Sequence, residues 1–291
     1  MIIGQLMSGL MRSSLLFMVT AGLTLLYGVM GTMNMAHFSF YMIAAYVTWT
    51  FWHLFGGSSY AFWISIVISG LVMIAIAGLV ERLVMRRIYN RILPQQLLAT
   101  FALTYIFSDL VKIVWGLEFL NVGKKGILAK YISVGGIPFP ISNLFVILLG
   151  LVIVCAIWFT LYKTKFGRIV RACHSYKEVV GALGIRVPMV YAIVFAISGL
   201  LAGLAGSAWT AIGSINLGLE QSLLVDAFCV MVIGGMGSFV GTAVASLIVG
   251  MAYSFAILAV PRMSTLFIFI ITGLFLIFRP WGLFGTKGRL H

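Results

Sequence analysis

Charged residues are scarce in this chain of 291 residues: Asp, Glu, Lys and Arg make up 9% of it, whereas 62% is hydrophobic. A soluble domain has about a quarter charged residues, so this composition excludes one. The mean hydropathy of +1.15 and repeated apolar runs predict an all-α polytopic integral membrane protein. At about 20 residues per span, we expect about eight to ten transmembrane helices, including glycine-interrupted or re-entrant segments, in a single transmembrane domain over residues 1–291.

Acidic residues are the rarest charged type, with six in the chain. We place Asp226 near an outer helix entrance, where it could line a path, and Glu220 in a loop, so none is expected at mid-membrane. Carriers coupled to protons or sodium ions use acidic side chains at membrane depth. Ion coupling is therefore poorly supported, but an ion-coupled carrier or channel for a small polar solute stays open as an alternative.

Catalytic and nucleotide-binding motifs are missing as well. The chain has no G-x-x-x-x-G-K-[ST] phosphate loop and no Ser-His-Asp arrangement. Its three cysteines, Cys155, Cys173 and Cys229, lack the spacing of a metal site. We therefore predict that the chain is not an enzyme, has no catalytic residue, metal site or cofactor, and cannot hydrolyse ATP unaided.

Basic residues, in contrast, are abundant: 19 Lys and Arg give a formal net charge of +13. They stand between apolar runs, which indicates membrane orientation rather than nucleic-acid binding. If the three basic clusters are cytoplasmic, the N-terminus lies outside and residues 223–260 must cross twice or form a re-entrant segment. Thirteen basic residues fall in these clusters, namely residues 82–91, residues 163–186 and a tail with Arg279, Lys287 and Arg289.

The basic segment 163–188 reads as a folded loop. Ser175 followed by Glu178 fits a capping box at a helix start. Val179, Val180 and Leu183 then share one face, and a glycine supplies a left-handed stop. We predict a docking element for a cytoplasmic partner, with a solvated loop whose charges only fix topology as the alternative. The predicted docking residues are Arg168, Arg171, Ser175, Glu178, Val180, Leu183 and Gly184.

Two glycine-rich segments, residues 28–37 and 234–241, interrupt long apolar runs. The pattern Gly-Val-Met-Gly-Thr in the first resembles Gly-Gly-Met-Gly-Ser in the second, and paired interrupted helices mark transport paths in membrane proteins. The alternatives are that the glycines only permit close packing and that Asn34 and His37 cap a broken helix. The predicted path residues are Met30, Gly31, Asn34, His37, Phe38, Gly234, Gly235, Met236, Gly237 and Ser238.

Signature motifs follow one another along nearly the whole chain. They are Tyr27-Gly28, Asn34-Met-Ala36-His37, Tyr41-Met-x-x-Ala45-Tyr46-Val47, Glu81-Arg82-Leu-Val-x-Arg86, Gly167-Arg168-x-x-Arg171-Ala172, Gly184-Ile185, Ala202-Gly203-x-Ala205-Gly206 and Gly234-Gly235-x-Gly237-Ser238-x-x-Gly241. Together they resemble the permease subunits of high-affinity branched-chain amino-acid ABC transporters, LivH type.

This resemblance implies an ABC importer that passes amino acids, branched-chain ones first among them, across the bacterial inner (plasma) membrane. It implies a second permease subunit, either a sister chain or a second copy, two cytoplasmic ATPases that bind the ATP, and an extracytoplasmic binding protein. Surrounding lipid is the remaining partner. The family usually has glycine where this chain has Phe38 and Ala44, so aromatic amino acids, amides and urea stay open as solutes.

Overall fold

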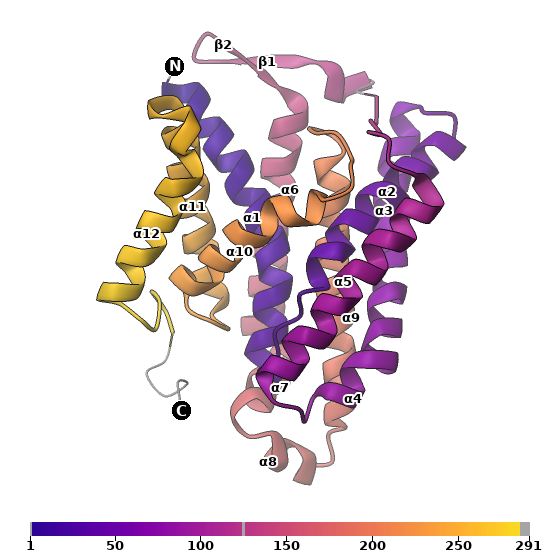
Figure 1. Cartoon of the computed structure of the whole chain (residues 1–291), viewed down its shortest axis with the longest axis vertical. Coiled ribbons are helices and arrows are strands. Elements are labelled where there is room, and N and C mark those ends of the chain that lie inside the picture. Colours follow the sequence, from indigo (N-terminus) through magenta and orange to yellow (C-terminus); the bar gives the residue numbers. More distant parts are fainter. Residues whose placement is uncertain (1, 124–125, 286–291) are drawn as a thin grey trace.

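The computed structural model describes residues 2–123 and 126–285. Apolar runs form helices because, in lipid, a helix satisfies its backbone hydrogen bonds within one segment. The elements (Figure 1) are α1 (Ile2–Met30), α2 (His37–Leu54), α3 (Ser59–Val80), a π-helical turn (Glu81–Met85), α4 (Arg86–Ile88), α5 (Leu93–Trp115), a 3₁₀ turn (Gly126–Ala129), β1 (Tyr131–Val134), β2 (Ile137–Pro140), α6 (Ile141–Lys163), α7 (Lys165–Ser175), α8 (Lys177–Ala182), α9 (Val187–Trp209), α10 (Leu219–Gly234), α11 (Phe239–Ala259), a second 3₁₀ turn (Pro261–Met263) and α12 (Ser264–Phe278).

Seven helical segments of the described chain are long and apolar enough to cross a membrane. They are α1, α3 extended to Ile88, α5, α6, α9, α11, and α12 extended back to Pro261. The shorter α2 and α10 also run within the bundle and are largely buried against these spans. The structure therefore confirms the all-α polytopic fold, and with α2 and α10 the number of helices falls within the predicted range.

The basic residues gather at one end of the bundle. Helices α4, α7 and α8 lie together at the bottom of Figure 1, and we call this the basic end (residues 82–91 and 163–186). The start of α1 and both strands lie at the opposite end, which we call the hairpin end. Helix α10 runs obliquely at mid-height to the turn before α11, and α11 returns towards the hairpin end (Figure 1). Residues 223–260 therefore form a short helix that does not span, followed by a span, which corresponds to the re-entrant arrangement among the two that the charge distribution predicts. Of the predicted basic tail, Lys287 and Arg289 lie outside the described residues.

A short β-hairpin joins α5 to α6 at the hairpin end. Strand β1 pairs antiparallel with β2, and Gly135 and Gly136 turn between them with φ of +59° and +82°. Two successive positive φ angles are what a type I′ hairpin turn requires, and glycine adopts them without steric strain. The hairpin lies outside the helical bundle and covers its end.

Helix α1 is central to the bundle and packs closely against α11. A Cβ atom on Gly250 would lie 2.6 Å from the backbone nitrogen of Ser13, so the two backbones meet where only glycine fits. Further along, the hydroxyls of Thr24 and Thr242 are hydrogen-bonded at 2.8 Å. Small residues that allow such close approach hold membrane helices together, because lipid supplies no hydrophobic drive for helix association. We call the contact marked by these two pairs the α1–α11 seam.

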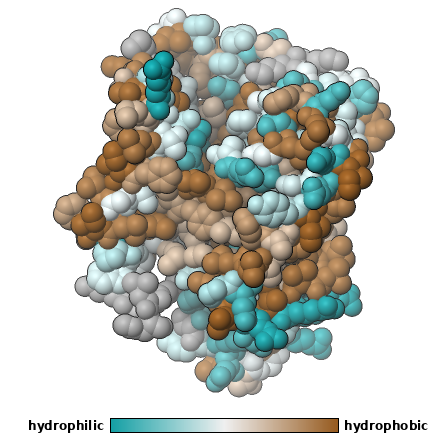
Figure 2. All heavy atoms as spheres, in the orientation of Figure 1, coloured by the Kyte–Doolittle hydropathy of each residue, from teal (hydrophilic) through white to brown (hydrophobic). Residues whose placement is uncertain are grey.

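The outer surfaces of several helices are apolar. Figure 2 shows hydrophobic side chains over much of the middle of this face and hydrophilic ones at the basic end. Leu110 and Ile113 of α5, and Leu276 and Ile277 of α12, are large exposed apolar side chains. Patches of this extent are rare on soluble monomers, and here they suit contact with lipid or with another membrane subunit.

We predict that Gly250→Ala weakens the α1–α11 seam, because the added methyl group overlaps the backbone of Ser13. Overpacking of this kind costs about 1–3 kcal/mol, and the unfolding temperature of the detergent-solubilised protein should fall by several degrees. Gly273→Ala is the matched control, since a Cβ atom at Gly273 meets nothing within 4 Å. Equal unfolding temperatures for the two variants would contradict the claim that close packing at Gly250 stabilises the α1–α11 seam.

Candidate functional site

The structure brings the two glycine-rich segments predicted from the sequence into contact. A Cβ atom on Gly28 would lie 3.0 Å from the carbonyl oxygen of Gly237. Gly28 lies in the last turns of α1, and Gly237 lies in the turn between α10 and α11. The segments therefore meet where the α1–α11 seam ends. This closeness agrees with a shared path and equally with packing, so the path stays a prediction.

The second glycine segment is a tight turn. Gly235 has φ of +94°, and Ser238 caps α11 by accepting a hydrogen bond from the N–H of Gly241 at 3.1 Å. The N–H of Phe284 donates to the carbonyl of Gly234 at 3.2 Å. Residues that follow α12 therefore pack directly onto this turn, which explains why it contains so little side-chain volume.

The first glycine segment leaves helical geometry after Met30. Gly31 has φ of +67°, and the Asn34 side-chain oxygen accepts a hydrogen bond from the N–H of Ala36 at 3.1 Å, just before α2 begins. The amide nitrogen of Asn34 and the hydroxyl of Thr32 are buried without a partner among the described residues. Asn34 thus stabilises the turn into α2, and its amide nitrogen and the Thr32 hydroxyl are buried polar groups with unused hydrogen-bonding capacity.

His37 is fully buried and connects three helices. Its Nε2 lies 2.9 Å from the carbonyl oxygen of Val19 on α1, and its Nδ1 lies 3.0 Å from the hydroxyl of Ser198 on α9. One neutral tautomer satisfies both contacts, with Nε2–H donating to the carbonyl and Nδ1 accepting from the hydroxyl. Gly22 makes room for the ring, since a Cβ atom there would lie 2.6 Å from it. In this conformation His37 presents neither nitrogen to a solute.

Phe38 and Met236, two of the predicted path residues, both lie next to α10. The ring of Phe38 is fully buried, and its centroid lies 5.9 Å from that of Phe228 in the middle of α10. Met236 is half-buried in the turn that follows α10. Helix α10 therefore connects the two predicted path segments.

Helix α10 also carries two buried acidic residues, and here the sequence expectation is wrong. Asp226 forms an ion pair with Arg12 of α1 at 2.5 Å, and the Arg12 guanidinium lies 3.4 Å from the ring centroid of Tyr253. Arg12 is roughly 15 Å along α1 at 1.5 Å per residue, so this pair lies deep in the bundle rather than at an open entrance. Glu220, expected in a loop, is buried in the first turn of α10. The signal in the sequence that could have revealed this ion pair is Arg12, because a lone charge in an apolar run requires a partner.

At the basic end, α7 and α8 form a folded element between α6 and α9 (Figure 1). The hydroxyl of Thr164 caps α7 by accepting a hydrogen bond from the N–H of Gly167 at 3.1 Å. The predicted capping box is wrong, because α7 continues through Ser175. Tyr176 is the N-cap of α8, without a side-chain hydrogen bond, and Glu178 is an exposed residue of its first turn.

The predicted apolar face of α8 is divided between two sides of the helix. Val180 is buried against the bundle, whereas Val179 and Leu183 are 57% and 74% exposed. Residues four apart lie on one face of a helix, so Val179 and Leu183 point outward together. Gly184 has φ of +82°, which confirms the left-handed stop. Helix α8 therefore presents an apolar outer face at the basic end.

The two arginines of α7 lie in different surroundings. The Arg171 guanidinium donates a hydrogen bond to the carbonyl of Leu161 in α6 and lies 5.1 Å from the ring centroid of Tyr162. It thus holds the corner between α6 and α7 from within the chain. Arg168 is exposed and remains available to a partner. A Cβ atom on Gly167 would collide with the carbonyl oxygens of the last turn of α6, so the corner also requires glycine.

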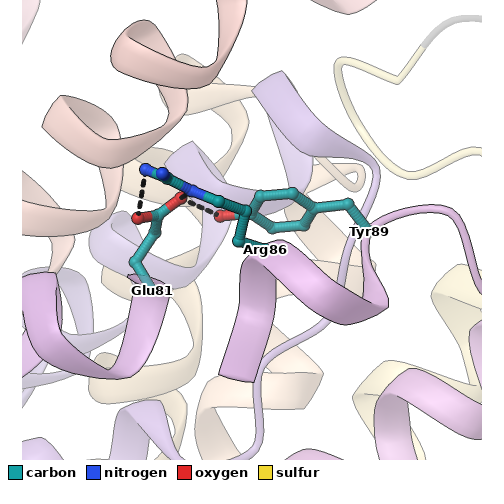
Figure 3. A network of polar contacts seen from close by, with 3 residues as sticks. All are labelled: Glu81, Arg86 and Tyr89. Atoms are coloured by element: carbon teal, nitrogen blue, oxygen red, sulfur yellow. Dashed lines mark hydrogen bonds and ion pairs between the residues drawn. The ribbon is translucent and has the colours of Figure 1, made fainter. Parts of the chain in front are cut away.

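A polar network closes the basic end of α3 (Figure 3). Arg86 donates to both carboxylate oxygens of Glu81, at 3.3 and 3.1 Å, and the Tyr89 hydroxyl donates to Glu81 at 3.1 Å. Residues five apart do not face each other on an α-helix, and the π-helical turn (Glu81–Met85) brings them together. Burial, and then the charge of Glu81, raise the pKa of Tyr89, so its hydroxyl keeps its proton and remains a donor.

Beside this network lies a groove of about 600 Å³ at the junction of α8 and α9. Tyr191 of α9 connects the surrounding elements, since its ring meets Tyr89 edge to face at 5.4 Å and lies 5.8 Å from the Lys177 ammonium group of α8. We use the name docking face for the groove together with Val179 and Leu183. The groove is lined by Arg86, Gly181, Ile185, Arg186, Val187, Pro188, Met189 and Ala192.

Metal-ligating side chains do not cluster within residues 2–123 and 126–285: no group of three or more His, Cys, Asp or Glu could hold an ion there. Cys155, Cys173 and Cys229 are unpaired. Burial raises the pKa of Cys173 in α7, which makes this thiol a poor nucleophile. Cys173 and Cys229 are buried and behave as packing residues, whereas Cys155 is exposed on α6.

Comparison with known proteins decides the family. The profile described as "Branched-chain amino acid transport system / permease component" matches residues 5–278. The chain belongs to this permease family. Its members are the non-catalytic membrane subunits of ABC importers, which work with ATPases and a solute-binding protein and lack cofactors of their own. The predicted resemblance, and the prediction that the chain is a transport subunit rather than an enzyme, are confirmed.

Relatives of this permease transport more than one class of solute. Permease protein BraD of the high-affinity branched-chain amino acid transport system of Pseudomonas aeruginosa is 26% identical over 97% of this chain and 95% of its own length. The probable branched-chain amino acid transport permease LivH of Methanocaldococcus jannaschii is 27% identical over 83% and 77%. Fructose import permease FrcC of Rhizobium meliloti is 30% identical over 48% and 43%. No solved structure matches the chain.

We predict that Leu183→Asp on the docking face of this permease prevents stable binding of the ATPase subunits. A charge would replace an apolar side chain that a partner must cover, so co-purification with the ATPases should fall at least fivefold while membrane insertion is unchanged. Phe119→Asp is the control, because Phe119 is similarly exposed at 71% but follows α5 towards the hairpin end. Undiminished co-purification of Leu183→Asp would remove α8 from the interface.

We further predict that Gly167→Ala disrupts the α6–α7 corner of the permease. The added methyl group collides with the last turn of α6, so ATP hydrolysis by the assembled complex should no longer be coupled to uptake. Gly78→Ala provides the comparison on α3, since a Cβ atom there meets nothing within 4 Å. Coupling ratios, measured as ATP hydrolysed per solute taken up, should change in the first variant alone. A shared change would show that the corner has no special role.

Proposed function

We propose that this chain is the permease subunit that passes branched-chain amino acids across the bacterial inner membrane. The observation that carries the proposal is its likeness to BraD over 97% of the chain, against 48% for the fructose permease. BraD and LivH are both named for branched-chain amino acid transport. The buried ring of Phe38 and the half-buried ring of Phe228 add an apolar wall that suits a leucine, isoleucine or valine side chain.

The partners we propose follow from the two ends of the bundle. By the rule that cytoplasmic loops are rich in Lys and Arg, the basic end faces the cytoplasm, and two ATPases bind the docking faces of a pair of permeases. The extracytoplasmic binding protein then delivers its solute at the hairpin end. The exposed apolar side chains of α5 and α12 meet lipid and the second permease, which is a sister chain or a second copy.

The path we propose runs along α10. Phe228 meets Phe38 in the middle of this helix, and the turn that follows it touches Gly28. The free hydroxyl of Thr32 and the free amide nitrogen of Asn34 supply polar groups for the charged end of an amino acid. Opening of the Gly28–Gly237 contact would join these features into one passage.

The alternative functions fit these features less well. An ion-coupled carrier needs an acidic side chain that can release and rebind its ion. Asp226 pairs with Arg12, which leaves Glu220 for such a role, so the match to a permease family over residues 5–278, rather than the acidic residues, speaks against this function. Urea and small amides have no apolar side chain to occupy the wall formed by Phe38 and Phe228. The relative that is named for fructose import aligns with less than half of the chain.

We expect the complete importer, with its second permease, ATPases and binding protein in proteoliposomes, to take up radiolabelled leucine only when ATP is supplied to the ATPases. Unlabelled valine and isoleucine should compete, and urea and fructose should not. Liposomes with this chain alone are the control and should show no uptake. Uptake by the chain alone would indicate a carrier or channel, and ATP-dependent uptake of urea or fructose instead of leucine would contradict the proposed solute.

A further inference from the structure

Glu220 is a buried carboxylate with one oxygen unused. It lies in the first turn of α10 and is 1% exposed. One carboxylate oxygen accepts a hydrogen bond from the Ser108 hydroxyl of α5 at 2.8 Å. The other oxygen is buried and has no partner among the described residues. A buried acceptor left unsatisfied is costly, so such a group in a native fold calls for an explanation.

A second unused polar group lies on α2, which packs against the same helix α5. The hydroxyl of Tyr46 is fully buried and has no partner in the described part of the chain. The ring of Tyr46 packs against Trp115 of α5, with centroids 5.3 Å apart. The Trp115 N–H is occupied, because it donates to the Thr50 hydroxyl at 2.7 Å. Helix α5 therefore contacts both Glu220, with its free carboxylate oxygen, and an aromatic pair with a free phenol oxygen.

Residues 2–123 and 126–285 contain no cation that pairs with Glu220. Their two ion pairs join Arg12 to Asp226 and Arg86 to Glu81. Lys112, one turn beyond Ser108 on α5, is exposed and does not come within ion-pair distance of Glu220. Carboxylates inside a membrane protein are normally paired or functional, and Asp226, six residues further along α10, shows the paired case.

The first turn of α10 also carries exposed polar residues beside Glu220. Gln221 and Ser222, directly after Glu220, are exposed polar residues, although α10 lies at mid-height in the bundle (Figure 1). Figure 2 shows hydrophilic side chains on this face, where α10 begins beside α5. A polar surface at this depth suits water or another subunit better than lipid.

We infer that Glu220, Tyr46 and Ser108 bind the ammonium group of the transported solute, an inference that rests on the proposed function. An ammonium group has three donors and no acceptor, which matches the free carboxylate oxygen and the oxygen of the phenol. The faces of Tyr46 and Trp115 attract a cation through their ring electrons. The site recognises the amino end of an amino acid at the start of α10. The contact of Phe228 with Phe38 lies further along the same helix, which ends at the glycine turn.

Two substitutions separate charge from hydrogen bonding at this site. In the complete importer, Glu220→Gln keeps the shape and the Ser108 contact but removes the charge, and we expect leucine uptake to fall at least tenfold. Glu220→Asp keeps the charge and should retain more uptake than the glutamine variant. Asp109→Asn is the control, because it removes an exposed carboxylate next to Ser108 and should leave uptake unchanged. Leucine uptake by Glu220→Gln that equals or exceeds uptake by Glu220→Asp would overturn the inference.

Chemical protection tests binding without transport. Dicyclohexylcarbodiimide modifies carboxyl groups in apolar surroundings, and peptide mass spectrometry can follow its reaction at Glu220 in the purified importer. Leucine should reduce this labelling, whereas 4-methylpentanoate, which lacks the amino group, and sodium ions should not. Protection by sodium ions or equally by both organic compounds, or no protection at all, would contradict an ammonium site. Leucine uptake by the wild-type importer tests the proposed function separately, since it does not involve the variants.

Discussion

Close backbone approach between α1 and its neighbours is the constraint on which the rest of this structure depends. Lipid provides no hydrophobic drive for helix association, so the bundle relies on positions such as Gly250 against Ser13, where two backbones nearly touch. The same packing continues to Gly28 against Gly237 and thereby brings two distant glycine segments together. The geometry of the predicted path is thus a consequence of how α1 is packed.

The two buried acidic residues of α10 have contrasting surroundings. The ion pair of Asp226 with Arg12 fixes α10 to α1, and removal of Arg12 would leave a buried carboxylate without its charged partner. Glu220, on the same helix, has no such partner within the described chain. We interpret the first as a structural contact and the second as a group kept free for a ligand. At the basic end, the π-helical turn brings Arg86 and Tyr89 to Glu81, so that both of its carboxylate oxygens are paired within the chain.

Much of the fold could be predicted from the sequence, because hydropathy and charge act locally. The spans, the common end of the internal basic segments and the stop at Gly184 were all predicted correctly. Contacts between distant residues could not be predicted, and these account for the errors. Asp226 and Glu220 seemed to lie at an entrance and in a loop because nothing near them in sequence reveals Arg12 or Ser108. Ser175 fitted a capping box, but tertiary packing extends α7 through it.

The central claim is that solute passes along α10 when the ATPases act on the docking face. Single cysteines at Ser222, Phe38 and Met236, in a complete importer without Cys155, Cys173 and Cys229, test it with a membrane-impermeant thiol reagent. Ser222 is exposed, Phe38 is buried and Met236 is half-buried in the present conformation. Our account predicts that labelling at all three positions changes between the nucleotide-free and ATP-bound states. Labelling that is the same in both states at every position would contradict it.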